Sequence, residues 1–521
     1  MLSLLSVLAG IVLLIYLYVR FNDQGLSQLP SEAMAFAPNR FTPHVVRETA
    51  EKLASSPKIV KDTLPTKTGR RYIVVGAGFL GGWIIIQLLE RGEDPKKIRI
   101  LDIRPSTRSD LRTGLAAQVA FFQVDITRAK AVDDAFQAPW PDCDPSETVP
   151  EVTVFHTAAN IRFYERHLAL LPRSSKVNHE GTQNVINAAR SIGVTVLIYT
   201  SSGSISVRRS RLWLWPWEKH PKYFVQLIND DDNLIPKYHD HFFSNYAASK
   251  ALGERAVRVA DGSQSGEKTL RTGCIRPGNG VFGPGGDLIC GAYLARKYNI
   301  TWVANIMQSF VYVENCALAH LCYEARLLET ARGGSNPDLG GQAFTITDTG
   351  PPVIYSDVYV GLTTLAPETT FTEMSPTLML FISHIIEVLY LSRAFLSMSS
   401  SPVRRALAHF IPNIVGDTIN LQPSLFALAS VHLIFDDSRA RLPPEKGGLG
   451  YHGPFTTLEG LCRTAEEHFK AGENGQERSQ FGGVSLSFLR PRKAPKEMTQ
   501  INKMEKRVSE RLHVEAVDVL G

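Results

Sequence analysis

A tyrosine and a lysine four residues apart carry the strongest chemical signal in the sequence. They stand in Tyr246-Ala-Ala-Ser-Lys250, and residues at this spacing share one face of a helix. A free phenol has a pKa of about 10 and is a poor base at neutral pH. A nearby positive charge favours the phenolate, which could take the proton of a substrate hydroxyl. Taken alone, however, the pattern is common on solvated helix faces.

A hydroxyl group stands upstream of this pair, at the end of a predicted strand. Ser202 closely follows an apolar run at 194–199. In doubly wound sheets ligands bind at the carboxyl ends of the strands, so a hydroxyl there can hydrogen-bond the reacting oxygen. Together, Ser202, Tyr246 and Lys250 predict proton transfer at a substrate oxygen.

A glycine-rich turn predicts a dinucleotide site. Its sequence is Gly76-Ala77-Gly78-Phe79-Leu80-Gly81. It directly follows a predicted strand at 71–75 and precedes a predicted helix at 83–90. Glycine permits the tight turn and the close approach of a pyrophosphate, which binds at the positive end of the helix. The pattern alone is weak, but this context predicts that the turn contacts a nicotinamide dinucleotide.

An acidic residue, Asp102, ends the next predicted strand, at 98–102. It comes about twenty residues after the turn, where a carboxylate accepts hydrogen bonds from the adenosine ribose. Because a carboxylate repels a 2′-phosphate, Asp102 favours NAD over NADP, although Arg104 works against that preference. The alternative is a surface turn residue. With NAD bound, Tyr246 would take the substrate proton while hydride passes to the nicotinamide, and Lys250 would bind the nicotinamide ribose.

Two further predicted strands end in residues that suit cofactor contact. Asp125 and Ile126 follow one strand, where an adenine ring would pack. Ala158 and Ala159 follow the other, where small side chains let the backbone approach the cofactor. These strands are expected at 119–124 and 152–156, with a helix at 178–191. The alternation of strands and helices predicts an α/β fold, a doubly wound parallel sheet (Rossmann).

The N-terminal segment is apolar enough to enter a membrane. Residues 2–19 carry no charge, and their length is near the ~17–25 residues of a spanning helix. A cleaved signal peptide is the alternative, but no basic residues precede the run and no small-residue cleavage site follows it. Because basic residues are frequent after the run, the positive-inside rule predicts a single-pass protein with its catalytic domain in the cytosol.

We expect five segments along the chain. They are a transmembrane anchor (1–20), a linker with one short helix at 45–54 (21–69), a Rossmann domain with the catalytic residues (70–345), a smaller C-terminal substrate-binding lobe (346–470) and a flexible tail with a short helix around 504–512 (471–521). Within the lobe, 377–396 is strongly apolar but contains Glu387 and Arg393. Because a charge at mid-bilayer is costly, we expect a buried or monotopic helix there rather than a second span.

Composition and charge exclude several classes of protein. Hydrophobic residues make up 44% and charged residues 21% of the chain, as in ordinary globular proteins. A net charge of +5 over 56 basic and 51 acidic residues gives no basic stripe for nucleic acid. The six cysteines form no CxxC pair and stand beside no histidine cluster, so we expect free thiols in a reducing compartment and no metal site.

Taken together, the motifs resemble the extended short-chain dehydrogenase/reductase superfamily. Within it they are most similar to the 3β-hydroxysteroid dehydrogenase family, including the decarboxylating sterol-4α-carboxylate 3-dehydrogenases. The resemblance covers about residues 71 to 470. Besides the motifs above it rests on Val177-Asn178-x-x-Gly181-Thr182, Tyr199-Thr-Ser-Ser202, Arg276-Pro277-Gly278, Val311-Tyr-Val-Glu-Asn315 and Phe435-Asp-Asp-Ser-Arg-Ala440.

The resemblance implies a role for each site residue. Ser202 would orient the substrate, Tyr246 would be the base and Lys250 its activator. Asn178 would hold a structural water or a helix bend behind the lysine, and Pro277 would contact the cofactor. The resemblance also implies NAD, a sterol-like lipid substrate, the endoplasmic reticulum membrane, and partner enzymes of a sterol or terpenoid pathway.

Two features depart from the family pattern. The glycine turn appears one residue shorter than the family's GxxGxxG. An insertion-like stretch at 208–236 separates Ser202 from Tyr246 and holds arginines beside Trp213, Trp215 and Trp217. Such residues suit a membrane interface or the mouth of a lipid pocket. A packed surface excursion is the alternative.

The sequence thus predicts NAD-dependent oxidation of a 3β-hydroxyl on a sterol-like or triterpenoid lipid, with C4 decarboxylation where a carboxylate is present. Coupled Δ5–Δ4 isomerisation is an alternative that needs a proton-shuttling acid, which the sequence does not place. Reduction of a non-steroid ketone, or a flavonoid-type or nucleotide-sugar substrate, fits an N-terminal anchor poorly. A non-catalytic NAD-sensing module is the last alternative, and the intact Ser202, Tyr246 and Lys250 argue against it.

Overall fold

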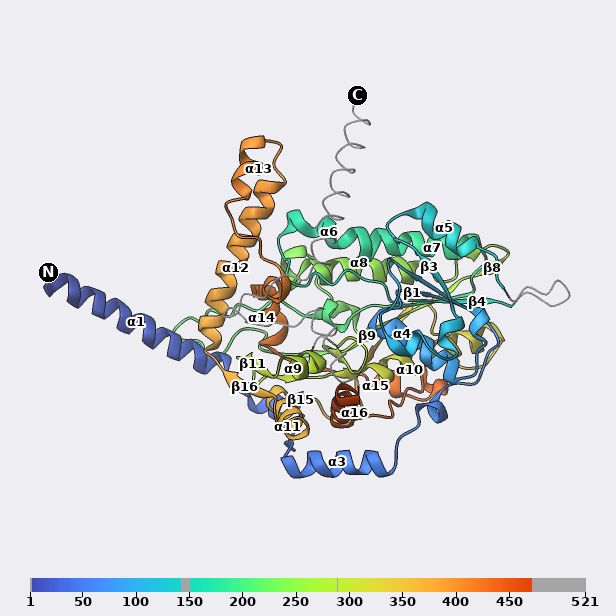
Figure 1. Ribbon diagram of the computed structural model, residues 1–521, viewed down its shortest axis with the longest axis horizontal. Helices are drawn as coiled ribbons and strands as arrows, with labels where there is room; N and C mark the ends of the chain where they lie inside the picture. The colour runs from blue at the N-terminus through green and yellow to red at the C-terminus, as the bar shows by residue number, and fades with distance from the viewer. Residues whose placement is uncertain (1, 142–149, 288, 471–521) are drawn as a thin grey trace. The chain divides into compact units, whose positions relative to one another are not determined.

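A seven-stranded parallel sheet forms the centre of the protein. The computed structural model describes residues 2–141, 150–287 and 289–470. The strands lie in the order β14-β9-β5-β4-β1-β2-β3 (Figure 1), so the chain runs outward from β1 in both directions. The strands are β1 (Arg71–Val75), β2 (Ile98–Asp102), β3 (Ala120–Gln123), β4 (Val152–His156), β5 (Val196–Thr200), β9 (Arg271–Pro277) and β14 (Gln342–Ile346). This order confirms the predicted doubly wound sheet.

Helices cover both faces of this sheet. All five residues of β1 are buried, as expected of a strand covered on both sides. Tyr72 and Val74 pack with residues of α4 (Phe79–Glu90) and α10 (Val313–Ala331). Ile73 and Val75 point the other way and pack with α5 (Ala129–Gln137), α7 (Thr182–Ser191) and α8 (Asn245–Val259). The alternation of the strand therefore divides the core into two layers.

Two helices differ from their predicted bounds at places that matter for the site. The helix expected at 83–90 begins at Phe79, directly after the glycine turn. The helix expected at 178–191 begins as a π-helix, η6 (Lys176–Gly181), before α7 continues it. Such one-turn π segments are frequent at functional sites.

A smaller lobe is built around a second sheet, of four strands in the order β15-β12-β17-β6. Its strands are β6 (Val225–Ile228), β12 (Met307–Gln308), β15 (Val353–Ile354) and β17 (His432–Phe435). A separate pair joins β11 (Tyr298–Thr301) to β16 (Thr370–Glu373). Since β6, β11 and β12 precede residue 346, the lobe draws on both sides of the expected boundary, and the division at 346 stays a prediction.

The expected linker, 21–69, packs against the protein along much of its length. It contains α2 (Ser31–Met34) and α3 (Pro43–Ser55), which includes the expected helix at 45–54. Ala33 and Ala37 are buried in a cluster with Met307 of β12. Val46 of α3 is buried against Leu458 of α16 (Thr457–Lys470).

Two helices are long and apolar enough to cross a membrane, by length and composition: α1 (Leu2–Leu26) and α12 (Pro376–Ser397). The apolar side chains of α1 between residues 4 and 17 are exposed. A third of the most apolar part of α12 is buried, and a short helix, α13 (Pro402–Ala408), follows it.

The expected tail, with its helix around 504–512, lies outside the described residues, as does Cys143. The other five cysteines are buried free thiols.

Candidate active site

The glycine turn after β1 has the shape that a dinucleotide requires. Gly76 adopts a φ of +90°, and a Cβ atom there would stand 2.6 Å from the backbone nitrogen of Ala158. A Cβ atom on Gly81 would overlap the carbonyl oxygen of Gly76. Beside Gly78, in contrast, no atom lies within 4 Å of the position a Cβ would take. Two glycines thus allow close packing and one leaves open space for a pyrophosphate at the start of α4.

Asp102 lies beside this turn, as the sequence predicted. Its Oδ2 atom accepts a hydrogen bond of 2.8 Å from the backbone N–H of Ala77, and its Oδ1 atom lies 3.4 Å from the backbone nitrogen of Arg104. The carboxylate therefore holds the turn and stands at the end of β2, where an adenosine ribose would bind. Phe79 and Leu80 form the half-buried first turn of α4.

An arginine that sequence reasoning missed also lies at this turn. Arg108 donates a hydrogen bond of 2.9 Å to the carbonyl oxygen of Phe79 and stands 5.0 Å from the ring centroid of Trp83. Its partner carboxylate is that of Asp110, at 2.5 Å. The residue belongs to no motif, so no local pattern pointed to it. Its guanidinium adds positive charge beside the start of α4.

The remaining expected cofactor residues all lie at the carboxyl edge of the sheet. Asp125 is exposed, and its carboxylate accepts from the backbone N–H of Thr127 at 2.9 Å. Ile126 is buried. The backbone N–H of Ala158 donates to the carbonyl oxygen of Val75 at 2.9 Å. Ala159 is half-buried after β4, and Pro277 ends β9. The geometry brings these residues to one edge, and their contacts with a cofactor stay predictions.

The three expected catalytic side chains come from two neighbouring segments. Tyr246 and Lys250 lie on α8, whose first turn is capped by the Ser244 hydroxyl accepting from the Ala247 N–H at 3.3 Å. Ser202 is the second residue after β5, and its hydroxyl lies 2.7 Å from that of Ser204. Burial raises the pKa of Tyr246 to about 12, and a hydrogen bond with the Ser202 hydroxyl opposes that rise. Ser202 and Tyr246 therefore meet, as predicted.

Lys250 is held beneath these hydroxyls in a largely apolar setting. Its Nζ atom donates a hydrogen bond of 2.5 Å to the carbonyl oxygen of Thr200 and stands 4.0 Å from the ring centroid of Tyr199. Burial lowers the pKa of Lys250 to about 7, although Cys274 and Glu254 oppose that change.

The sequence predicts that the ammonium and the positive charge of a nicotinamide together favour the phenolate of Tyr246, and this stays a prediction. In the chain itself the pKa of Tyr246 is raised. The reason is that burial disfavours a charge on either group, while the ammonium is bound to Thr200 and Tyr199. The Lys250 ammonium donates to the Thr200 carbonyl oxygen rather than to the phenol of Tyr246. A phenolate therefore requires a further positive charge, such as that of an oxidised nicotinamide ring.

A buried histidine supports the strand end that holds Lys250, and sequence reasoning missed it. The Nδ1 atom of His320 lies 2.8 Å from the carbonyl oxygen of Cys316, so it carries the proton. Its Nε2 atom then accepts from the Thr200 hydroxyl, 2.7 Å away. Burial lowers the pKa of His320 to about 4 and keeps the ring neutral. The signal is absent from local sequence because α10 and β5 are more than a hundred residues apart.

Asn178 lies in the π-helix η6, where the resemblance implied a helix bend. Its Nδ2 atom donates to the carbonyl oxygen of Asn160 at 3.0 Å and to the Ser249 hydroxyl at 2.9 Å. Its Oδ1 atom accepts from the backbone N–H of Asn160 at 2.7 Å. Asn178 thus ties the loop after β4 to the residue preceding Lys250. Its part in the reaction stays a prediction.

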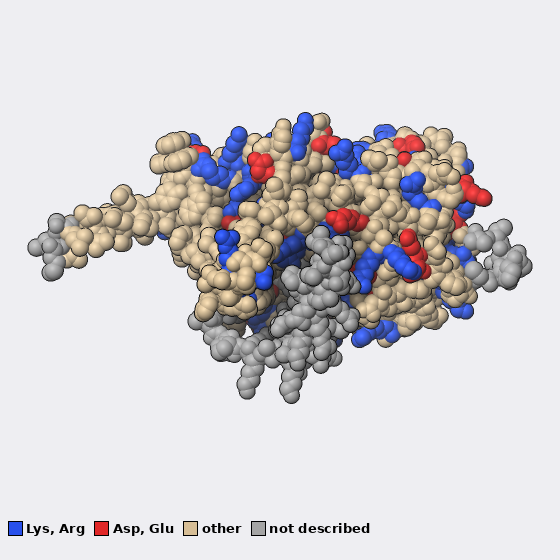
Figure 2. Space-filling model, turned by 90° about the horizontal axis from the view of Figure 1, so that it is seen from above, with Lys and Arg blue, Asp and Glu red and all other residues tan. Residues whose placement is uncertain are grey.

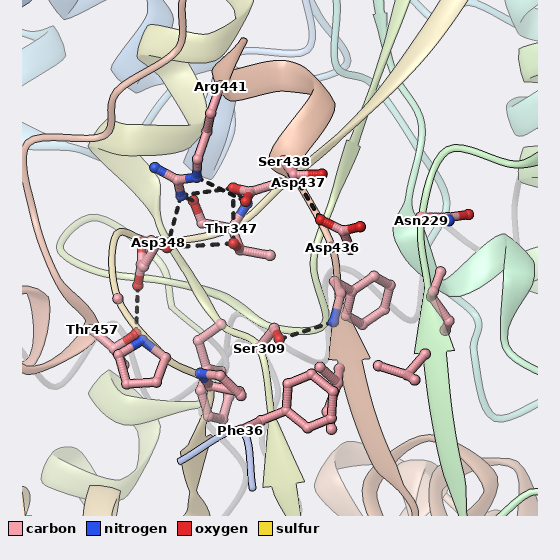
Figure 3. A pocket seen from close by; sticks show the side chains of 18 residues that line it. Phe36, Asn229, Ser309, Thr347, Asp348, Asp436, Asp437, Ser438, Arg441 and Thr457 are labelled. Atoms are coloured by element: carbon pink, nitrogen blue, oxygen red, sulfur yellow. Dashed lines mark hydrogen bonds and ion pairs between the residues drawn. The ribbon is translucent and has the colours of Figure 1, made fainter. Parts of the chain in front are cut away.

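A cavity of about 520 Å³ lies near this edge without including the catalytic side chains. Figure 3 shows Asp348, Asp437 and Arg441 at its polar end, with Phe36 at its apolar end. Arg441 donates to Asp437 at 2.7 Å, and burial raises the pKa of Asp348 to about 7. Ser202, Tyr246 and Lys250 do not line the cavity. The polar groups at this end of the cavity form hydrogen bonds with one another.

Comparison with known families decides the class of protein. The sequence model of the "3-beta hydroxysteroid dehydrogenase/isomerase family" matches residues 72–366, which is more than half of the chain. The chain belongs to this family. The resemblance inferred from the motifs is therefore confirmed, and the member described here is an NAD(P)-dependent oxidoreductase acting on CH–OH groups.

Curated relatives come from plants, fungi and mammals. The chain is 28% identical over 429 residues to a 3beta-hydroxysteroid-dehydrogenase/decarboxylase of Arabidopsis thaliana, covering 79% of this chain and 64% of that one. It is 30% identical over 283 residues to a decarboxylating sterol-4-alpha-carboxylate 3-dehydrogenase of Schizosaccharomyces pombe, covering 53% and 69%. It is 30% identical over 296 residues to the 3 beta-hydroxysteroid dehydrogenase type 7 of Mus musculus, covering 55% and 70%. This family member thus spans slightly under two thirds of the Arabidopsis protein.

Among solved structures, an epimerase of Methanothermobacter thermautotrophicus has a similar fold. The TM-score is 0.50 at 16% identity, over 79% of this chain and 95% of that one. At this identity the similarity shows the fold alone. It agrees with the parallel sheet of this 3β-hydroxysteroid dehydrogenase family member.

Proposed function

We propose that the protein is an NAD-dependent dehydrogenase that oxidises the 3β-hydroxyl of a sterol-like or triterpenoid lipid, with loss of a C4 carboxylate as carbon dioxide. One observation carries the reaction: Ser202, Tyr246 and Lys250 gather at the sheet edge that also holds the glycine turn. The substrate class rests on the names of relatives, which include sterol-4-alpha-carboxylate 3-dehydrogenases.

The chain's own groups handle the proton of the reaction. A nicotinamide dinucleotide held by the glycine turn would, when bound, supply the acceptor for the hydride of the substrate. Ser202 orients the substrate oxygen, and Tyr246 takes its proton as the C3–O bond becomes a carbonyl. When a carboxylate stands at C4, the product is a β-keto acid, which loses carbon dioxide without further catalytic groups.

Burial of the pair sets the pH dependence of this step. Tyr246, with a pKa of about 12, is neutral at physiological pH. Burial lowers the pKa of Lys250 to about 7. A rise in pH therefore favours the phenolate of Tyr246 but removes the positive charge of Lys250, so the two groups act on the rate in opposite directions.

We further propose NAD rather than NADP. The Asp102 carboxylate, fixed by the Ala77 N–H, would repel a 2′-phosphate. Arg104 and Arg108 lie nearby and oppose this preference. The carboxylate prevails in this proposal because it stands at the strand end itself.

The proposed location is the endoplasmic reticulum membrane, as a single-pass protein with a cytosolic catalytic domain. The support is the exposed apolar flank of α1 and the basic residues that follow it. Such a location suits a substrate that partitions into the bilayer.

The test is turnover by the full chain in lipid nanodiscs, followed by NADH absorbance and product mass spectrometry. A 4-carboxysterol is expected to give the 3-ketone with loss of carbon dioxide, and a 3β-hydroxysterol without the carboxylate to give the 3-ketone alone. A conjugated Δ4-3-ketone from a Δ5 substrate would instead indicate isomerisation. Binding of NAD without turnover of any 3β-hydroxy lipid would overturn the proposal in favour of a sensing module.

A further inference from the structure

Three segments far apart in the sequence are joined at one buried asparagine. Asn22 near the end of α1 is fully buried. Its Nδ2 atom donates to the hydroxyl of Thr377 in the first turn of α12, and its Oδ1 atom accepts from the backbone N–H of Leu214, each at 2.9 Å. The Tyr18 hydroxyl also donates to the Leu214 carbonyl oxygen, at 3.1 Å. The apolar helix α1, the tryptophan-rich segment and α12 therefore form one connected unit.

A second set of contacts fixes the tryptophan-rich segment to α12. The Nε1 atom of Trp213 donates to the Nε2 atom of His384, at 3.2 Å. The Trp213 ring also stacks against Tyr18, with ring centroids 6.4 Å apart. The insertion-like stretch is thus a packed element, and α12 starts beside the end of α1 (Figure 1).

The outer face of α12 is a continuous apolar stripe. Residues spaced by three, four or seven along a helix share one face. The exposed members of this stripe are Leu378, Phe381, Ile385, Val388 and Phe395. Exposed apolar side chains continue on and after α13, namely Val403, Leu407 and Phe410. Contiguous exposed apolar surface of this kind marks a protein or membrane contact.

The two charges that interrupt this segment in the sequence are turned inward. Both carboxylate oxygens of Glu387 accept from Arg166, at 2.5 and 2.6 Å. Arg393 donates to the carbonyl oxygen of Ala408 at 2.8 Å and to that of Ile411. The stripe is therefore uncharged, while the opposite face of α12 is built into the folded protein.

The tryptophans next to α12 have the character of an interfacial belt. Trp215 and Trp217 are 54% and 75% exposed, and their rings stack with centroids 5.4 Å apart. Arg211 stands 5.7 Å from the Trp215 ring, and Lys219 and Lys222 are exposed nearby. Tryptophan and basic side chains together suit the headgroup region of a membrane.

We propose that the stripe of α12 and α13, together with Trp215 and Trp217, is a monotopic docking face that lies along the bilayer entered by α1. The occupant is a lipid bilayer with anionic headgroups, because the face is continuous with α1 through Asn22. The side chains of α1 from residue 4 to 17 are apolar or small and exposed all round, and they appear as an uncharged projection in Figure 2. A hydrocarbon phase covers a helix on every side, which a second folded protein does not.

The same contacts exclude α12 as a second span. Crossing the bilayer would release Glu387 from Arg166 and expose both charges to lipid, which is strongly unfavourable. Lying along the surface keeps those contacts and buries only the stripe. The charge at the rim, from Lys219, Lys222 and Arg404, then faces the headgroups.

Spin labels measure this arrangement in the full chain. With Cys143→Ser as the background, one label is placed on the stripe by Val388→Cys, and a control label by Val259→Cys. Val259 is also an exposed valine on a helix, at the end of α8. In anionic vesicles, oxygen dissolved in the lipid is expected to relax the label at 388 at least threefold more than that at 259. Equal access of a water-soluble nickel complex to both labels would overturn the proposal.

Two further variants separate the rival arrangements. Ser399→Asn creates a glycosylation site with Ser401 between α12 and α13, and it is expected to stay unmodified in microsomes. Glycosylation at this site, with the catalytic domain unmodified, would mean that α12 spans the membrane.

The double variant Phe381→Glu, Val388→Glu is expected to slow turnover of a vesicle-bound sterol several-fold, while a detergent-dispersed substrate reacts at an unchanged rate. Dimers that dissociate in this variant, with turnover in vesicles unaffected, would assign the face to a second copy and overturn the proposal.

Discussion

The carboxyl edge of the large sheet and the face built from α1, α12 and the tryptophans follow opposite rules. At the sheet edge, polar groups are buried and hydrogen-bonded, as with Lys250 and His320. On the other face, apolar groups are exposed and the charges are turned inward, as with Glu387. The first arrangement tunes proton affinity, and the second suits the membrane contact proposed above. The proposed chemistry and the proposed membrane contact therefore depend on different residues and can be varied separately.

The largest effect that tests this separation is expected from Tyr246→Phe. Removing the hydroxyl removes proton transfer, which contributes about 10²–10⁴-fold in comparable sites, so kcat is expected to fall by about that factor. Vesicle binding and thermal stability should stay close to those of the parent protein. Turnover within a factor of two of the parent would contradict the role of Tyr246, and lost vesicle binding would contradict the separation.

A smaller effect is expected from Asp102→Asn. The amide keeps an oxygen that can accept from the Ala77 N–H but lacks the charge that repels a 2′-phosphate. The preference for NAD over NADP, measured as a ratio of kcat/KM values, is expected to fall about tenfold, which corresponds to about 1.4 kcal/mol. Arg108→Ala is the comparison of opposite sign: loss of its positive charge is expected to weaken both cofactors, and NADP more than NAD. An unchanged ratio would rule out Asp102 as the source of preference.

The next largest effect on kcat is expected from removal of the Thr200 hydroxyl. Thr200→Val removes the hydrogen bond to His320, and Thr200→Ser keeps it. A net hydrogen bond is worth about 1 kcal/mol, so we expect the valine variant to lose about fivefold in kcat, with the serine variant near the parent. Because the Thr200 carbonyl holds Lys250, the pH profile of the valine variant should also shift. Equal kinetics for both variants would show that this hydroxyl does not position the lysine.

The last expected effect concerns the dependence of stability, rather than of rate, on pH. The pKa of Lys250 is about 7 in the folded protein against 10.5 as its ordinary value. Between these values the unfolded chain binds the extra proton, so the free energy of unfolding rises as pH rises from about 7 towards about 10. Lys250→Met should flatten that rise, seen as thermal unfolding temperatures in detergent. The double glutamate variant of α12 should keep the parent's slope between these two pH values, since both of its residues lie away from the sheet edge. Parallel curves for parent and Lys250→Met would mean that the lysine is not buried as described.

The sheet edge could be predicted from the sequence far better than the other face. The strands β1, β2 and β4 are short apolar runs followed by turns, and their bounds match the predictions. Contacts such as His320 with Thr200 could not be foreseen, since they join elements that no local pattern relates. The same holds for β6 and β12, which pair through β17 across long stretches of chain.

The α12 segment shows what composition leaves open. Its apolar run with Glu387 and Arg393 allowed either a buried or a monotopic helix. Only the partners of these charges, Arg166 and the carbonyl oxygens after α13, distinguish the two faces of the helix. The periodicity of the sequence could not show which face of α12 is buried. The packing of the folded chain decides which face stays exposed.

The packing of the segment after α1 has a kinetic consequence. Leu26, Ala33 and Ala37 are almost fully buried, so the segment holds α1 close to the lobe. In the proposed membrane arrangement, the enzyme meets its substrate by lateral diffusion in two dimensions. Its rate then follows the mole fraction of substrate among the surrounding lipids. Adding inert lipid at constant amounts of enzyme and sterol would slow the reaction by surface dilution, even though no bulk concentration changes.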